Sequence, residues 1–236
     1  MSARVAGNPS AQRRVAIVGR LGVYPMVKLS LAGRRLLAYL ALQRQSVRRG
    51  VASAELWPDM TDEAGRANLR RALWRLPRGW VDAFGDELVL DAESDLADAH
   101  RTAARALAGE PLTLGEIEVL SNDILPGWHD DWVLTAQETF RLLRVQALEA
   151  ACRTMAASGA HALATQAGAA AVAAEPLRES AAEALIEAHL AQRNRYEAAQ
   201  CFRSLAHRLH VELGVLPDPA LTERVASFGL TQTHLH

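Results

Sequence analysis

The stretch TDEAGRANLRRALWRLP, residues 61–77, has the features of an amphipathic helix with a defined start and end. Thr61 or Asp62 can cap the N-terminus, because each side chain offers an oxygen to the free N–H groups of the first turn. Pro77 removes a backbone donor and disfavours helical geometry in the residue before it. The sequence therefore predicts a helix over residues 63–76.

The two faces of this predicted helix differ in chemistry. At about 100° per residue, the face that can be buried carries Leu69, Ala72, Leu73 and Leu76. The opposite face and its flanks carry Ala64, Ala67, Arg66, Asn68, Arg70, Arg71, Trp74 and Arg75, and Arg78 joins them if the helical path continues. Small alanines allow close approach to a groove, and arginines donate paired hydrogen bonds to guanine edges or to phosphates.

This arginine-rich face predicts DNA binding in the major groove, the usual position of the second helix of a helix-turn-helix. Asn68 can pair with an adenine edge, and Arg48 with Arg49 offers a second basic site for the phosphate backbone. Two interpretations of Trp74 stay open. It contacts a thymine methyl or a sugar, or it packs against the aromatic residues of the following hairpin, which the sequence favours. A solvated arginine-rich face is the alternative to DNA binding.

The segments around this helix complete the pattern of a winged helix-turn-helix. Short apolar pieces separated by breakers over residues 15–29 predict strands of a small antiparallel sheet. A helix over residues 31–43 and a short helix over residues 51–56 follow. A hairpin signal lies at residues 80–90, where Gly85-Asp86 separates two apolar segments.

Beyond residue 91 the chain becomes a nearly continuous series of alanine- and leucine-rich helices. The expected helices span residues 95–108, 114–120, 131–157, 160–174, 177–192 and 196–213. Residues 159–164 resemble residues 194–199, an offset of 35 residues, and tetratricopeptide repeats have a period of about 34. We expect an all-α tetratricopeptide-like domain, with an ordinary alanine-rich bundle as the alternative.

Charge divides the chain in the same place. Residues 1–90 hold 15 Lys+Arg against 7 Asp+Glu, a net charge of +8, whereas the remainder holds 11 against 20, a net of −9. This asymmetry indicates two domains with different partners. The partner of the basic N-terminal domain is expected to be a polyanion.

The sequence lacks the common catalytic and nucleotide-binding motifs. Lys28, the only lysine, stands between Val27 and Leu29, so there is no Walker A motif, and the Rossmann, nucleophile-elbow and zincin motifs are absent too. We therefore expect a chain that is not an enzyme, with no catalytic residue, cofactor or metal. No apolar run is long enough to span a membrane, and no signal peptide is recognisable.

The weaker candidates for chemistry have simpler interpretations. His207 and His210 lie about one helical turn apart, but no third ligand is near them in the sequence. A solvated surface pair is therefore favoured over a metal site. The acidic residues of His129-Asp130-Asp131 stand where a helix begins, and they favour its N-terminus. Cys152 and Cys201 are too few for a disulfide framework, which indicates buried thiols and a cytoplasmic location.

In order along the chain, several segments resemble the Streptomyces antibiotic regulatory protein (SARP) family. In the N-terminal half they are GRLGV (19–23), LAGRRLLAYLAL (31–42), ELWPD (55–59) and ANLRRALWRL (67–76). In the C-terminal half, similar to that family's bacterial transcriptional activator domain (BTAD), they are DILPGW (123–128) with Trp132, EPLRE (175–179) and ELGVLPDP (212–219).

The resemblance implies an OmpR-like winged helix joined to a tetratricopeptide-like domain. It implies binding of direct repeats in double-stranded promoter DNA and recruitment of RNA polymerase, often at secondary-metabolite gene clusters. By position, Arg71, Arg75 and Arg78 correspond to the groove-facing helix, and Arg48-Arg49 to the basic turn. The chain departs from the family at Pro77, where a basic residue is usual, and at an acidic wing whose carboxylates would repel phosphates.

Taken together, the sequence predicts a mainly α protein with a small antiparallel β part. The expected parts are a flexible N-terminus (1–13), a winged helix-turn-helix (14–92), the activator domain (93–228) and a C-terminal tail (229–236). The expected function is that of a cytoplasmic DNA-binding regulator, most simply an activator. Its helical domain contacts RNA polymerase or forms a homodimer. Two alternatives stay open, a protein-interaction adaptor with weakened DNA binding and a ligand-responsive sensor.

Overall fold

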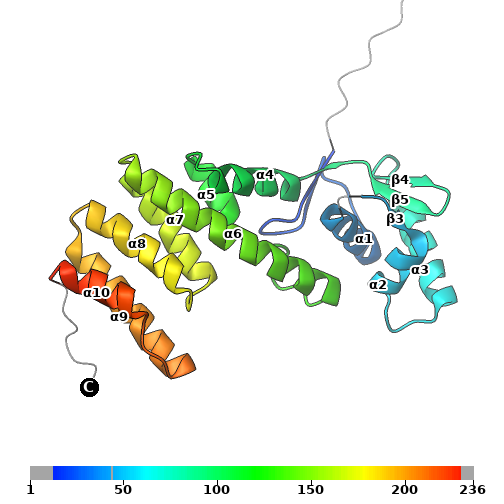
Figure 1. Ribbon diagram of the computed structural model, residues 1–236. Helices are drawn as coiled ribbons and strands as arrows, with labels where there is room; N and C mark the ends of the chain where they lie inside the picture. The colour runs from blue at the N-terminus through cyan, green and yellow to red at the C-terminus, as the bar shows by residue number, and fades with distance from the viewer. Residues whose placement is uncertain (1–12, 44, 230–236) are drawn as a thin grey trace, which may run out of the picture. The chain divides into compact units, whose positions relative to one another are not determined.

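A computed structural model of the chain describes residues 13–43 and 45–229 (Figure 1). The expected flexible N-terminus and C-terminal tail therefore lie outside the described residues, apart from residues 13 and 229. Two compact units can be distinguished. The first runs to Asp98 and also includes Ile124–Gln137, and the second comprises Ala99–Asp123 and the chain from Glu138 onward.

A small three-stranded sheet opens the first unit. β1 (Arg14–Ala16) pairs antiparallel with β2 (Gly22–Tyr24) and parallel with β6 (Glu93–Ser94). The parallel pair was not expected, because its second strand lies far along the chain. The last of the apolar pieces that predicted strands, residues 26–29, forms no strand. Pro25, which lacks a backbone N–H, stands at the point where the antiparallel ladder would have to continue.

Three helices form the helix-turn-helix part of this unit. α1 (Leu31–Leu42) is capped by Ser30, whose hydroxyl accepts from the Gly33 N–H at 3.1 Å. α2 spans Arg49–Leu56, and α3 spans Asp62–Arg75. The hydroxyl of Thr61 caps α3 by accepting from the Ala64 N–H. The expected helices over this part of the chain are thus confirmed to within two residues at each end.

Burial on α3 is narrower than the helical wheel predicted. Leu69 and Ala72 are 2% and 1% exposed, whereas Leu73 and Leu76 are only partly buried. Gly65 is buried as well, and a Cβ built on it would lie 2.7 Å from Ser53 Oγ on α2. The inner face of α3 is therefore set one turn nearer its N-terminus than we expected, because a glycine permits close contact with α2.

The wing is a second three-stranded sheet, in the order β3-β5-β4 (Figure 1). β4 (Val81–Phe84) and β5 (Glu87–Leu90) form the expected hairpin, and β3 (Val47–Arg48) extends it. Gly85 has a φ of +59°, a conformation that glycine adopts without strain in a tight turn. β3 was not predicted, since two residues give no periodic signal.

Residues 124–137 complete the first unit. The backbone of Ile124 bridges to Val18, and the Leu125 N–H donates to the Ile17 carbonyl at 2.9 Å. The Trp132 ring packs edge-on against Tyr39, with 5.3 Å between centroids. Residues 124–137 thus contact strands and helices of the first unit that lie far before them in the sequence.

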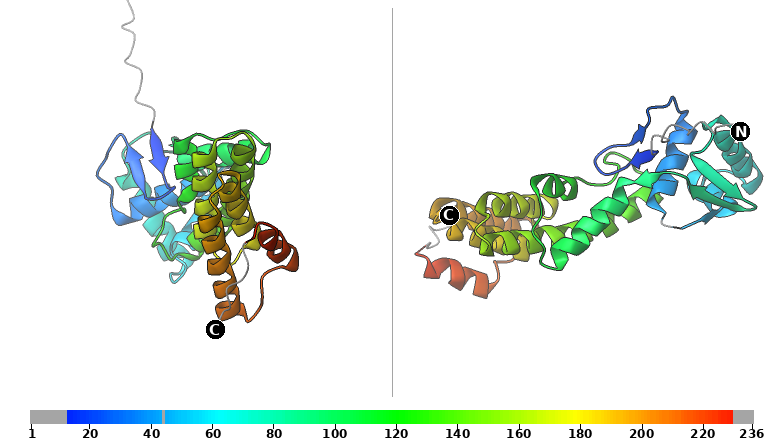
Figure 2. Two further views of the ribbon diagram at one scale, coloured as in Figure 1. Left: turned by 90° about the vertical axis from the view of Figure 1, so that its left-hand side faces the viewer. Right: turned by 90° about the horizontal axis from the view of Figure 1, so that it is seen from above.

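The second unit is helical throughout its regular structure. Its helices, two of which begin in residues of the first unit, are α4 (Asp95–Leu107), α5 (Leu114–Ser121), α6 (Asp131–Ala157), α7 (His161–Ala174), α8 (Glu179–Ala191), α9 (Arg195–Leu213) and α10 (Pro219–Ser227). α7, α8 and α9 lie side by side (Figures 1 and 2). Only α10 was not predicted. No described helix is long and apolar enough to cross a membrane.

Two turns show a structural repeat in this unit. Gly159 and Arg193 both have positive φ, +80° and +58°. In each case the next residue closes the preceding helix, because the Ala160 N–H donates to Met155 O and the Asn194 N–H to His189 O, both at 2.9 Å. Equivalent turns are thus 34 residues apart, one fewer than the offset we inferred from sequence, and this matches the tetratricopeptide period.

Close helix packing supports this repeat. A Cβ built on Gly168 of α7 would lie 2.9 Å from Cys152 Sγ on α6 and 3.1 Å from Leu185 on α8. The buried Glu149 carboxylate accepts from Arg178 Nε and from Ser180 Oγ, which holds α6 to the start of α8. Small residues and one partly buried ion pair therefore set the spacing of these helices.

We expect Leu69→Ala to lower the free energy of unfolding of the first unit by about 2 to 5 kcal/mol, because it leaves a cavity beside α1. Leu73→Ala should cost clearly less, since Leu73 is only partly buried. Denaturant unfolding followed by fluorescence measures both. Equal losses for the two variants would contradict the burial pattern of α3.

Gly168→Val should lower the melting temperature of the second unit, with a cost of about 1 to 3 kcal/mol for overpacking. The control is Gly115→Val on α5, where an added Cβ meets nothing within 4 Å. If both substitutions were tolerated alike, the close approach of α6, α7 and α8 would be wrong.

Candidate nucleic-acid interface

The outward face of α3 carries a cluster of exposed arginines. Leu69 and Ala72 face the core on one side of the helix, so the residues on its other side point away from the core. Five arginines are exposed on this helix and just after it: Arg66, Arg70, Arg71, Arg75 and Arg78. Among the described residues, none of them forms an ion pair with a carboxylate. Their guanidinium groups can therefore meet a polyanion without first breaking an internal pair.

Asn68 and Arg71 are joined to each other. Arg71 Nη2 donates to Asn68 Oδ1, Arg71 Nε donates to the Ala67 carbonyl at 3.4 Å, and Asn68 Nδ2 lies 2.9 Å from Met60 Sδ. Asn68 is half-buried by these contacts. An adenine contact by Asn68 would require its amide to leave Met60. This partner was not found from sequence, because Met60 lies in the loop before the helix.

The indole of Trp74 is 83% exposed, and Phe84 is 68% exposed, whereas Trp80 is buried. The favoured expectation, that Trp74 packs against the aromatic residues of the hairpin, is therefore wrong. Its place on α3 points the ring outward beside the arginines, because the positions facing the core are taken by Leu69 and Ala72. The other interpretation, contact with a thymine methyl or a sugar, stays a prediction.

Two hollows flank α3. The wing-side hollow, of about 420 Å³, lies between the end of α3 and β4 and is lined by Arg49, Arg70, Leu73, Trp74, Leu76, Pro77, Arg78, Gly79, Val81 and Ala83. The turn-side hollow, of about 390 Å³, lies toward the start of α3 and is lined by Arg48, Gly50, Val51, Ser53, Ala54, Asp62, Arg66 and Asp86. Arg49, Arg70 and Arg78 thus line one hollow and Arg48 and Arg66 the other, whereas Arg71 and Arg75 line neither.

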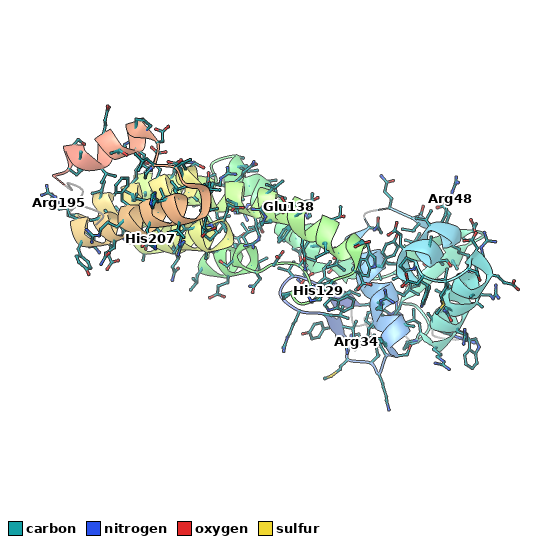
Figure 3. The ribbon with its side chains drawn as sticks, turned by 90° about the horizontal axis from the view of Figure 1, so that it is seen from below. Arg34, Arg48, His129, Glu138, Arg195 and His207 are labelled. Atoms are coloured by element: carbon teal, nitrogen blue, oxygen red, sulfur yellow. The ribbon has the colours of Figure 1, made fainter. Side chains whose placement is uncertain are left out.

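Arg49 links the start of α2 to the tip of the wing. Its backbone N–H donates to the Asp86 carbonyl at 2.8 Å, and its Nε donates to the Gly85 carbonyl at 3.2 Å. Glu87, beside the tip, accepts from Ser46 Oγ. Arg48, the other arginine of the basic turn, is exposed at the start of α2 (Figure 3). The wing tip is therefore fixed, and its carboxylate belongs to the turn-side hollow.

The other candidates for chemistry have structural roles or none. Asp130 pairs with Arg35 of α1, and its carbonyl accepts from the Val133 N–H at 2.8 Å, which starts α6. His207 and His210 are both exposed. Among the residues that the structure describes, no group of three or more His, Cys, Asp or Glu side chains is placed to hold a metal ion.

Both thiols lie against backbone carbonyls in the second unit. Cys152 is buried, with Sγ 3.3 Å from the Ala184 carbonyl, and burial raises its pKa to about 12. Cys201 is half-buried, and burial raises its pKa to about 11. A raised pKa keeps a thiol protonated at neutral pH, so neither sulfur is an activated nucleophile.

We expect neither thiol to react readily with a disulfide reagent in the native protein at pH 8, where a thiol of pKa 11 is ionised in about one molecule in a thousand. After unfolding in denaturant, both thiols should react with the reagent at the rate of a free thiol. Fast labelling of Cys201 before unfolding would show that its sulfur is more exposed or more acidic than the structure indicates.

The family model of the bacterial transcriptional activator domain matches residues 81–227. Among solved structures, the chain is similar to Mycobacterium tuberculosis EmbR in complex with low affinity phosphopeptide, with a TM-score of 0.66 and 20% identity. The match covers 92% of this chain and 65% of that chain. No curated protein sequence matches.

At 20% identity the likeness to EmbR shows the fold alone. That fold agrees with the predicted class, which is confirmed: a mainly helical chain with small sheets, in which a winged helix-turn-helix precedes an all-α tetratricopeptide-like part. This chain spans 65% of the length of the EmbR chain that it matches.

Proposed function

Because the chain belongs to the bacterial transcriptional activator domain family, we propose that it is a DNA-binding transcriptional regulator, most simply an activator. The work of such a protein is non-catalytic: it holds a promoter and brings a partner to it. The observation that carries the DNA-binding part is the exposed arginine face of α3, which has no carboxylate partner among the described residues.

The division of labour on α3 follows from its geometry. Arg71 and Arg75 are both exposed, one turn apart on α3, and neither of them lines the two hollows beside the helix, so a groove could receive them directly. Arginine donates paired hydrogen bonds to the O6 and N7 atoms of guanine, so these two residues are our candidates for base contacts. The regulator would act in the cytoplasm, where promoter DNA is accessible.

The second unit offers a surface for a protein partner. Val211, Leu213 and Leu216 are exposed at the end of α9 and in the loop after it. Exposed apolar residues that are close in sequence are typical of protein-protein contact. We propose that this unit contacts RNA polymerase or a second copy of the chain, so that binding of promoter repeats leads to activation.

The test of DNA binding is retention of genomic fragments on the full chain at two salt concentrations, followed by gel shift on the recovered duplexes. Affinity should fall steeply as salt rises, because bound counterions are released when arginines meet phosphates. Fragments retained equally at both concentrations would not support this function.

We expect Arg71→Ala combined with Arg75→Ala to abolish specific binding of a recovered duplex without lowering the melting temperature, since both side chains are exposed. Arg34→Ala, an exposed arginine of α1 (Figure 3), is the matched control and should bind as the wild type does. Unchanged affinity of the double variant would remove α3 as the recognition helix.

A further inference from the structure

The two hollows beside α3 have similar volumes but differ in charge. Three arginines line the wing-side hollow, and no carboxylate is among its lining residues. The turn-side hollow has two arginines and two aspartates, Asp62 and Asp86, so its formal charge is zero. Arginines of the same helix, Arg66 and Arg70, are thus placed in different surroundings only one turn apart.

The wing-side hollow has the features of an anion site. Its three guanidinium groups come from three segments, the start of α2, the middle of α3 and the loop before β4. Partly buried Leu73, Leu76 and Val81 form an apolar part of its wall, and such a wall lowers the local dielectric and strengthens attraction for an anion. Arg49 is held by the Gly85 carbonyl through Nε, which leaves its terminal nitrogens for a ligand.

We propose that the wing-side hollow is the phosphate-binding site of the first unit and that it holds one strand of the DNA backbone beside α3. This inference rests on the proposed function and adds to it which arginines position the duplex and which select its sequence. Arg70 and Arg78, with Arg49, bind backbone phosphate, and Trp74 covers the adjoining sugar. Arg48 and Arg66 contribute little, because Asp62 and Asp86 neutralise the hollow that they share.

The position of Asp86 gives the inference a second consequence. In the turn-side hollow its carboxylate would repel a phosphate that approached the wing tip. The tip is also fixed to Arg49 by two hydrogen bonds, so it does not reach away from the unit. The wing of this protein therefore supports the phosphate site with β4 rather than inserting its tip into the minor groove.

The experiment measures the salt dependence of DNA binding by the full chain. A duplex selected from a random-sequence pool by the wild type, and a scrambled duplex of the same composition, are titrated over a series of KCl concentrations by fluorescence anisotropy. Arg70→Ala and Arg78→Ala should each reduce the slope of log K against log[salt] by about 0.9, equally on both duplexes, because each removes one phosphate contact. Arg70→Lys keeps the charge and should keep the slope.

Arg66→Ala and Arg48→Ala are the matched controls, and their slopes should stay within error of the wild type. DNA binding by the wild type should be little affected by a minor-groove ligand such as netropsin, and DNA binding by Asp86→Asn should be equally little affected. Equal slope changes for Arg66→Ala and Arg70→Ala, or a loss confined to the selected duplex in Arg70→Ala, would overturn the inference while the proposed function stands. If the wild type binds neither duplex, both fall.

Discussion

The contact between Gly65 of α3 and Ser53 of α2 is the constraint on which the outward arginine face of α3 depends. It brings the two helices so close that a single added Cβ would lie 2.7 Å from the serine hydroxyl. Together with the burial of Leu69 and Ala72, it fixes the rotation of α3 about its own axis. Because side chains on a helix have fixed angular positions, the same constraint turns the arginines outward. Packing inside the unit thus decides which charges face a ligand.

Much of this was accessible from the sequence because the signals are local. The cap at Thr61, the arginine-rich face of α3 and the hairpin around Gly85 each depend on neighbouring residues, and the structure has all three. The elements that were missed need distant partners. β6 pairs with β1 across most of the first unit, and Ile124 returns to the first sheet from beyond two helices. A two-residue strand is too short to show a periodic pattern, so the sequence cannot predict such a pairing.

The candidate interface shows the same limit. Each arginine was identified from the sequence, but the helical wheel gives no reason to distinguish Arg66 from Arg70. Their difference arises from Asp62 and Asp86 on one side and from Arg49 and Arg78 on the other, which the fold brings together from separate segments. The exposure of Trp74 has a similar cause, because its aromatic neighbour in sequence, Trp80, is buried, whereas Trp74 stands on the outer side of α3.

The return of residues 124–137 to the first sheet determines where the chain can be cut. A fragment that stops after the wing would keep every arginine of α3 and would lose the strand bridge at Val18, the indole that covers Tyr39 and the carboxylate that pairs with Arg35. Such a fragment would expose part of its own core to water. The smallest autonomous piece that keeps the arginine face of α3 must therefore include the beginning of α6, although that segment lies far from α3 in the sequence.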